Sequence, residues 1–264
     1  MHSTFLNTQW RLRPLLACHL VAVALLLSWL WQPTRQLWDQ FDLQLFSLLN
    51  QPVHAKGLWA HIWAIGSMRP VDLGVGVVML AVLLKAGLVF TGAQVRRALF
   101  AFLAVLLLLL LIRVGFSDLV KVMDWQRPSA SLVVEDCARL TQLFPEWEER
   151  WDMKDSATRS FPGDHASVLL IWAMFLSFFA RGWRLLLVWA MASLFMLPRL
   201  VAGAHWGSDA FVGGVLLSLL ALAWGCFTPF AWRASEWLEK VTLPLTQRLA
   251  SLPVLGWFSL ISGR

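Results

Sequence analysis

Charged residues are scarce in this chain. Only 14% of its 264 residues are Asp, Glu, Lys or Arg, whereas about a quarter is usual for a soluble domain. Tyrosine is absent, and two of the three cysteines, Cys18 and Cys226, lie inside apolar runs. The low charge argues against a disordered chain, a nucleic-acid-binding domain and most soluble enzymes. Cysteines placed in this way do not form a disulfide framework.

Apolar residues, by contrast, make up 58% of the chain and gather in long runs. The mean hydropathy is +0.64. A helix that crosses a bilayer needs about 20 mostly apolar residues, and several stretches of this length occur. The sequence therefore predicts an all-α integral membrane protein with a six-helix bundle. The predicted spans are residues 15–31, 71–90, 98–114, 165–180, 185–202 and 208–227.

Three further segments are too polar or too short to cross. Apolar residues recur at helical spacing over 38–49, which indicates an amphipathic helix that lies in the membrane interface. Residues 57–66 are expected at the same surface, and the mixed segment after Phe230 is expected to form a surface helix. No internal repeat or low-complexity linker divides the chain. We therefore predict one membrane domain over 1–264, with its core at about 71–230.

Basic residues predict how the chain is oriented. They occur in four segments that six spans would place on one side, which should be the cytoplasm. The residues are Arg11 and Arg13, Arg96 and Arg97, Arg181 and Arg184, and Arg233, Lys240 and Arg248. The loop 115–164, which holds 10 of the 16 acidic residues, falls on the opposite side. We expect both termini in the cytoplasm and this loop in the periplasm of a bacterium, across its inner membrane. The net charge of +6 then reflects cytoplasmic loops rather than nucleic-acid binding.

A group of ionisable residues falls on the periplasmic face at similar depth. Ionisable residues at membrane depth indicate a functional site, and cations without matching carboxylates favour an anionic ligand. Arginine offers paired donors to phosphate oxygens. The candidate residues are Lys121, Arg127, His165, Arg199, His205 and Asp209.

The residue types predict a phosphohistidine mechanism. Asp209 lies four residues after His205, so its carboxylate can orient one imidazole nitrogen and leave the other free to attack phosphorus. His165 can act as the general acid. Gly163 precedes a helix start, where backbone N–H groups can approach an anion. This chemistry needs no metal or cofactor, and no zinc-binding motif is found.

Three motifs resemble the signatures of the phosphatidate phosphatase type 2 superfamily. Residues 199–209 have its Arg, five residues, His, three residues, Asp pattern, and 161–165 are similar to its Pro-Ser-Gly-His signature. Residues 121–128 are similar to its Lys, six residues, Arg-Pro signature, but one residue shorter, so the reach of Lys121 to phosphate stays open. The resemblance covers about 71–230. It implies a membrane enzyme that acts on lipid phosphates.

The departures from these signatures resemble one branch, the lipid A phosphotransferases. They comprise the segments 160–165 and 198–206 and the pair Lys154-Asp155. The resemblance implies transfer of the terminal phosphate of undecaprenyl diphosphate to lipid A on the periplasmic face. Asp164 stands where the superfamily has glycine; a carboxylate next to a phosphate site is unexpected, and a helix cap is one explanation.

Two other functions remain open at this stage. With water as acceptor, the same residues would make an undecaprenyl diphosphate or phospholipid phosphatase. A transporter or flippase would bind a lipid headgroup without chemistry, and would never carry a covalent phosphate on His205.

Overall fold

The computed structural model describes residues 6–252 and 258–262, which are helical apart from connecting segments and one isolated bridge between Met68 and Met153. The predicted all-α class is confirmed. In chain order the α-helices are α1 (Leu12–Leu30), α2 (Gln32–Asn50), α3 (Leu58–Gly66), α4 (Arg69–Leu84), α5 (Gly92–Val122), α6 (Ala130–Val133), α7 (Leu140–Leu143), α8 (Pro145–Trp151), α9 (Asp164–Ser177), α10 (Trp183–Val201), α11 (Val215–Cys226), α12 (Phe230–Ala250) and α13 (Ser259–Ser262). A 3₁₀ helix, η1 (Gln51–Ala55), follows α2, and a π-helical segment, η2 (Asp209–Gly214), leads into α11.

Among the described residues, four helical segments are long and apolar enough to cross a membrane: α1, α5, α10 and the continuous η2–α11. The other two predicted spans are helical but shorter, since α4 has 16 residues and α9 has 14. At 1.5 Å per residue α9 is about 21 Å long, less than a hydrocarbon core of about 30 Å. The count of six full-length spans is therefore not matched. The first turns of the two short helices contain charged residues, Asp72 in α4 and Asp164 in α9.

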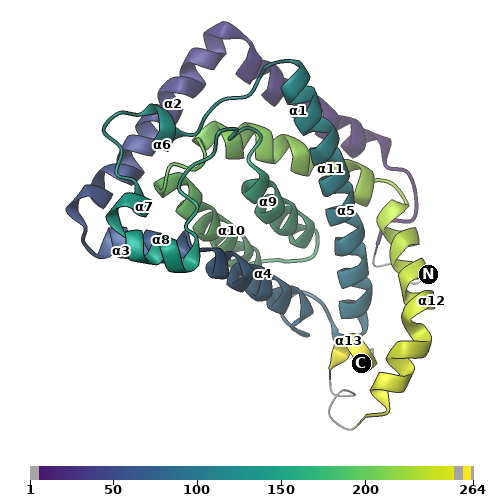
Figure 1. The fold of residues 1–264 in the computed structure, drawn as a ribbon. Coiled ribbons are helices and arrows are strands. Elements are labelled where there is room, and N and C mark those ends of the chain that lie inside the picture. Colours follow the sequence, from purple (N-terminus) through teal and green to yellow (C-terminus); the bar gives the residue numbers. More distant parts are fainter. Residues whose placement is uncertain (1–5, 253–257, 263–264) are drawn as a thin grey trace.

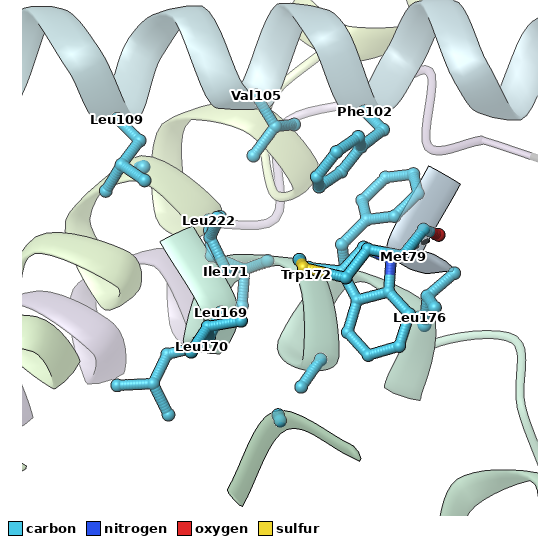
Figure 2. Close-up of a cluster of buried hydrophobic side chains, with 14 of the residues drawn as sticks. Met79, Phe102, Val105, Leu109, Leu169, Leu170, Ile171, Trp172, Leu176 and Leu222 are labelled. Atoms are coloured by element: carbon cyan, nitrogen blue, oxygen red, sulfur yellow. Dashed lines mark hydrogen bonds between the residues drawn. The ribbon is translucent and has the colours of Figure 1, made fainter. Parts of the chain in front are cut away.

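Helix α9 lies at the centre of the bundle (Figure 1). Nine of its residues are buried, and a helix that is apolar on all sides is typical of a core position. Figure 2 shows Val105 and Leu109 of α5 on one side of α9 and Met79 of α4 beside Trp172. The indole of Trp172 also donates a hydrogen bond to the carbonyl of Met79 at 3.2 Å. The core thus fixes α9, and with it the residues at its first turn.

The two segments predicted as surface helices, 38–49 and the one after Phe230, are helical, and the segment 57–66, for which no helix was predicted, is mostly helical too. Helix α2 includes 38–49, α3 includes most of 57–66, and α12 runs beside α5 (Figure 1). Helix α2 buries three residues on its inner side, of which Asp42 and Asn50 are polar. The Asn50 side chain accepts a bond from the Ala138 amide and donates to the carbonyls of Ala138 and Val201. Helix α2 therefore holds the long loop against the end of α10.

The predicted loop 115–164 is partly helical and is packed onto the bundle. Its first residues extend α5 to Val122, beyond the predicted end at 114, because apolar and helix-compatible residues continue there. The remainder is held by Asp155, whose carboxylate accepts bonds from the Thr141 amide and hydroxyl at 3.0 and 2.7 Å. Leu140 and Met153 belong to an apolar cluster with Trp63 of α3. The loop is thus a folded cap over one end of the bundle.

Helices α5 and α11 are in close contact at Gly225, so we expect the stability of the fold to be sensitive to the size of the side chain there. A Cβ atom added at Gly225 would lie 2.6 Å from Cγ2 of Val105, a stiff and fully buried side chain. We expect Gly225→Ala to force the helices apart and to cost about 1–3 kcal/mol. The measurement is thermal unfolding in detergent. Gly74→Ala is the matched control, since nothing lies within 4 Å of its added methyl; equal melting temperatures for the two variants would contradict this packing.

Candidate active site

Three helix ends meet beneath the cap. Helices α4 and α9 begin there and α10 ends there, while α5 contributes Arg113 and the segment before η2 contributes His205, so residues far apart in the sequence reach one place. They line a cavity of about 290 Å³, called here the main cavity. Its ionisable lining residues are Arg69, Asp72, Arg113, Lys154, Asp164, His165, Arg199 and His205. Three of the residues predicted from the sequence, His165, Arg199 and His205, are therefore brought together.

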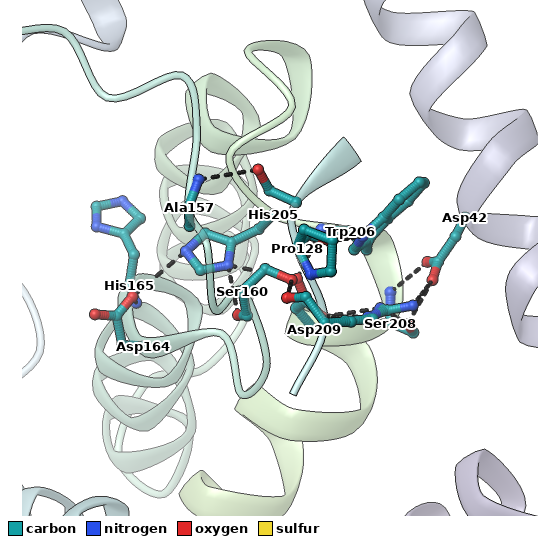
Figure 3. A network of polar contacts seen from close by, with 12 residues as sticks. Asp42, Pro128, Ala157, Ser160, Asp164, His165, His205, Trp206, Ser208 and Asp209 are labelled. Carbon is teal, nitrogen blue, oxygen red and sulfur yellow. Dashed lines mark hydrogen bonds and ion pairs between the residues drawn. The ribbon is translucent and has the colours of Figure 1, made fainter. Parts of the chain in front are cut away.

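His205 is held on both ring nitrogens (Figure 3). Its Nδ1 lies 2.9 Å from the carbonyl oxygen of Ser160 and 3.5 Å from Oδ2 of the fully buried Asp209. Its Nε2 lies 3.4 Å from Oδ1 of Asp164, whose side chain is half exposed. Because Nδ1 faces the protein interior, Nε2 is the nitrogen available for chemistry.

The two carboxylates control the proton on His205. Burial by itself lowers the pKa of an imidazole, but the contacts with Asp164 and Asp209 outweigh it and raise the pKa of His205 to about 9. The ring is therefore an imidazolium at neutral pH when no ligand is bound. It must lose the Nε2 proton before that nitrogen can act as a nucleophile.

Arg127 does not line the main cavity; it supports Asp209 from behind. Its guanidinium donates to Oδ1 of Asp209 at 2.8 and 3.2 Å, to Ser208 Oγ, and to Oδ2 of Asp42 at 3.0 Å. Asp42 is 2% exposed and also accepts from the Ser208 amide and hydroxyl. Arg127 thus lies behind Asp209 and away from the lining of the main cavity, where its contact with phosphate was expected. Sequence reasoning missed Asp42, although a carboxylate beside Phe41 and Leu45 in an amphipathic helix was a signal.

Arg199 lies in the wall of the main cavity and is almost fully buried. It forms an ion pair with Asp72 and donates to the carbonyls of Ser67 at 3.2 Å and Lys154 at 3.1 Å. These contacts fix its orientation at the end of α10. Asp72 was missed by the sequence reasoning; its place at the start of a predicted span, on the same face as the other charges, was the available signal.

His165 is oriented by the backbone of α10. Its Nε2 lies 3.2 Å from the carbonyl oxygen of Phe195. Its Nδ1 has no partner within the described part of the chain, and the residue lines the main cavity. When protonated, the ring therefore presents an Nδ1–H donor to a ligand there.

Gly163 and Lys121 lie elsewhere than expected. The Gly163 amide donates to the carbonyl oxygen of Asp209 at 3.0 Å, and an added Cβ would lie 2.7 Å from that oxygen. Glycine is thus required for close packing, and its N–H is not free for phosphate. Lys121 pairs with Asp118 at 2.9 Å and lines a neighbouring cavity rather than the main one.

Asp164, for which the sequence suggested a helix cap, is the first residue of α9, whose N-cap is Gly163. It contacts His205, accepts a bond from the His165 amide at 2.7 Å and lies 3.6 Å from Arg113. Arg113 was also missed, because it lies within the last apolar turn of the predicted third span. Over residues 6–252 and 258–262, no cluster of three or more His, Cys, Asp or Glu side chains is placed to hold a metal ion.

Comparisons with known proteins agree with these motifs. The profile of the PAP2 superfamily matches residues 98–234. Lipid A 1-diphosphate synthase from Escherichia coli (strain K12) is 28% identical over 226 residues, which cover 84% of this chain and 90% of that protein. No solved structure gives a significant match.

The site predicts a shifted titration of His205. Below a pKa of about 9 the ring is protonated, so acylation by diethyl pyrocarbonate, which needs neutral imidazole, should rise through pH 9. Asp164→Asn removes one stabilising carboxylate and should lower the midpoint by about one pH unit. The measurement is the mass of the peptide that contains residue 205 after timed labelling.

The control is Glu239→Gln, which removes a carboxylate paired with Arg97, away from the cavity. Its midpoint should equal that of the unmodified protein. If Asp164→Asn also left the midpoint at pH 9, Asp164 would not hold the proton on His205.

Proposed function

The chain belongs to the PAP2 superfamily, and we propose that it transfers the terminal phosphate of undecaprenyl diphosphate to lipid A through a phosphohistidine on His205. It is a membrane enzyme of lipid phosphates, either a phosphatase or a phosphotransferase. The likeness to lipid A 1-diphosphate synthase supports lipid A as the acceptor. The donor is the one that the resemblance of the sequence motifs implies. No metal or cofactor takes part in the proposed reaction.

One observation carries the proposal: Nε2 of His205 faces a cavity that also contains His165 and Arg199. A nucleophile, a proton donor and a phosphate-binding cation are thus within one small space. A passive headgroup-binding site needs cations, but it has no use for an imidazole whose second nitrogen is anchored by Ser160 and Asp209.

In the first displacement, Nε2 of His205 attacks the terminal phosphorus of the donor. Asp164 is the group in contact with that nitrogen and is the proposed first acceptor of its proton. The N–P bond forms as the P–O bond to undecaprenyl phosphate breaks. His165 gives its Nδ1 proton to the leaving oxygen, and Arg199 stabilises the charge that develops on the phosphoryl oxygens.

In the second displacement, a phosphate oxygen of lipid A attacks the phosphorus, and His165 acts as the general base that takes the proton of that phosphate. The N–P bond breaks, its electron pair returns to Nε2 of His205, and Nε2 takes back the proton that Asp164 held. Asp209 stabilises the ring charge throughout, and Arg127 holds Asp209 in place through two hydrogen bonds. The products are undecaprenyl phosphate and lipid A with one more phosphate.

We further propose that the site faces the periplasm from the inner membrane of a bacterium, with both termini in the cytoplasm. The distribution of basic residues supports this orientation. Labelling of single cysteines with an impermeant reagent in intact spheroplasts tests it, since a cysteine in the loop 123–163 should react and one next to Arg96 should not.

The proposal predicts that His205→Ala abolishes both the labelled protein and labelled lipid A when the donor carries ³²P in its terminal phosphate. His165→Asn should slow transfer by about 10²–10⁴-fold, because the leaving group then departs without a proton. The control is His54→Asn, an exposed histidine whose Nε2 lies 3.1 Å from the carbonyl oxygen of Asp136. Transfer retained by His205→Ala would overturn the assignment.

The same assay separates the competing functions. Label that appears in lipid A supports transfer. Label that appears only as free phosphate, with a labelled protein intermediate, shows that water is the acceptor. A protein that never becomes labelled, with intact donor, would show that the site binds without chemistry.

A further inference from the structure

A second cavity lies on the other side of Asp164. It has a volume of about 230 Å³ and is called here the side cavity. It shares four lining residues with the main cavity, namely Arg113, Lys154, Asp164 and His205. The imidazole of His205 is therefore in the wall of both cavities, and the pair of Asp164 and Arg113 stands between them.

The side cavity is strongly basic. Its lining contains four cations, Arg113, Lys121, Lys154 and Arg159, against the single carboxylate of Asp164. Asp118 offsets Lys121 at 2.9 Å, and Asp164 lies 3.6 Å from Arg113. The remaining two cations have no side-chain hydrogen bond or ion pair to the residues that the structure describes.

The cavity is built by the fold rather than left by chance on the surface. Helix α5 supplies one wall with Arg113 and Lys121, and the cap supplies the other with Lys154 and Arg159. The cap segment is fixed because the backbone of Lys154 donates to Ser67 and accepts from Arg199. Uncompensated cations held close together in this way call for an anionic ligand.

We propose that the side cavity binds a second phosphate group of the substrate lipids while the first lies at His205. This rests on the function proposed above, which involves two substrates that each carry phosphate. The group is either the inner phosphate of the diphosphate donor or the phosphate of the acceptor lipid. Lys121, whose reach to the reacting phosphate the sequence left open, belongs to this second site. The volume suits one headgroup phosphate rather than a whole lipid.

A binding measurement tests the site without turnover. Full-length His205→Ala protein in detergent, titrated calorimetrically with inorganic phosphate, should bind two phosphate ions per chain. Adding Arg159→Gln, which alters only the side cavity, should weaken one of the two sites about tenfold or more. Adding Arg150→Gln, which removes a charge from the same cap beside Trp151, should change neither. A single phosphate site, equal in all three proteins, would overturn the inference and leave the proposed function intact.

Kinetics then identify which phosphate the cavity holds. If it is the inner phosphate of the donor, Arg159→Gln should raise KM about tenfold for undecaprenyl diphosphate but not for phosphatidate, which has one phosphate. If it is the phosphate of the acceptor, only the KM for lipid A should rise, and Arg159→Lys should restore most of it. Lys121→Gln should raise the same KM that Arg159→Gln raises.

Two kinetic results would count against the side cavity. One is that Arg159→Gln and Arg150→Gln have the same KM for every substrate. The other is an equal loss with phosphatidate and with the diphosphate, which would show a general structural effect. If the protein binds two phosphate ions but transfers no phosphate to lipid A, the proposed function is refuted. The second phosphate site would then still be supported.

Discussion

The site depends on an imidazole whose inner nitrogen is held by buried groups. Asp209 is a buried carboxylate at a helix start, and the guanidinium of Arg127 compensates its charge. Asp42 in turn balances the charge of Arg127. Charges of alternating sign thus run from His205 to α2. Removal of one partner from such a chain leaves a buried charge without compensation, which costs far more than the pair contributes. The arrangement is therefore expected to be retained or lost as a unit.

Most of this support comes from outside the bundle core. Helix α2 supplies Asp42, the cap supplies Arg127 and the Ser160 carbonyl, and only Asp209 belongs to a long apolar segment. The core, centred on α9, fixes the positions of the helix ends through apolar contacts. These contacts supply none of the polar groups of the site. The amphipathic segments add the polar groups that an apolar bundle lacks. Packing and chemistry are thus divided between different parts of one chain.

On the open side of His205, Asp164 contacts Nε2, and Arg113 lies beyond Asp164. These contacts keep the imidazole of His205 protonated and partly balance the charges around it. Asp164 is half exposed, whereas Asp209 is fully buried. The two ring nitrogens of His205 therefore have different surroundings, because Nδ1 faces the buried Asp209 and Nε2 faces the half-exposed Asp164.

The sequence by itself determined the helical class, the apolar segments and the residues His165, Arg199 and His205, because hydrophobic periodicity and short motifs are local properties. The tertiary structure decided that α4 and α9 are short and that α5 is long. It also decided where Lys121, Arg127 and Gly163 lie. The contacts of Asp42, Asp72 and Arg113 were decided in the same way. The physical reason is that the direction of a guanidinium or an ammonium group depends on which carboxylates lie nearby. For Arg127 and Arg199 those carboxylates lie 82 to 127 residues away in the sequence, a distance that no local pattern spans.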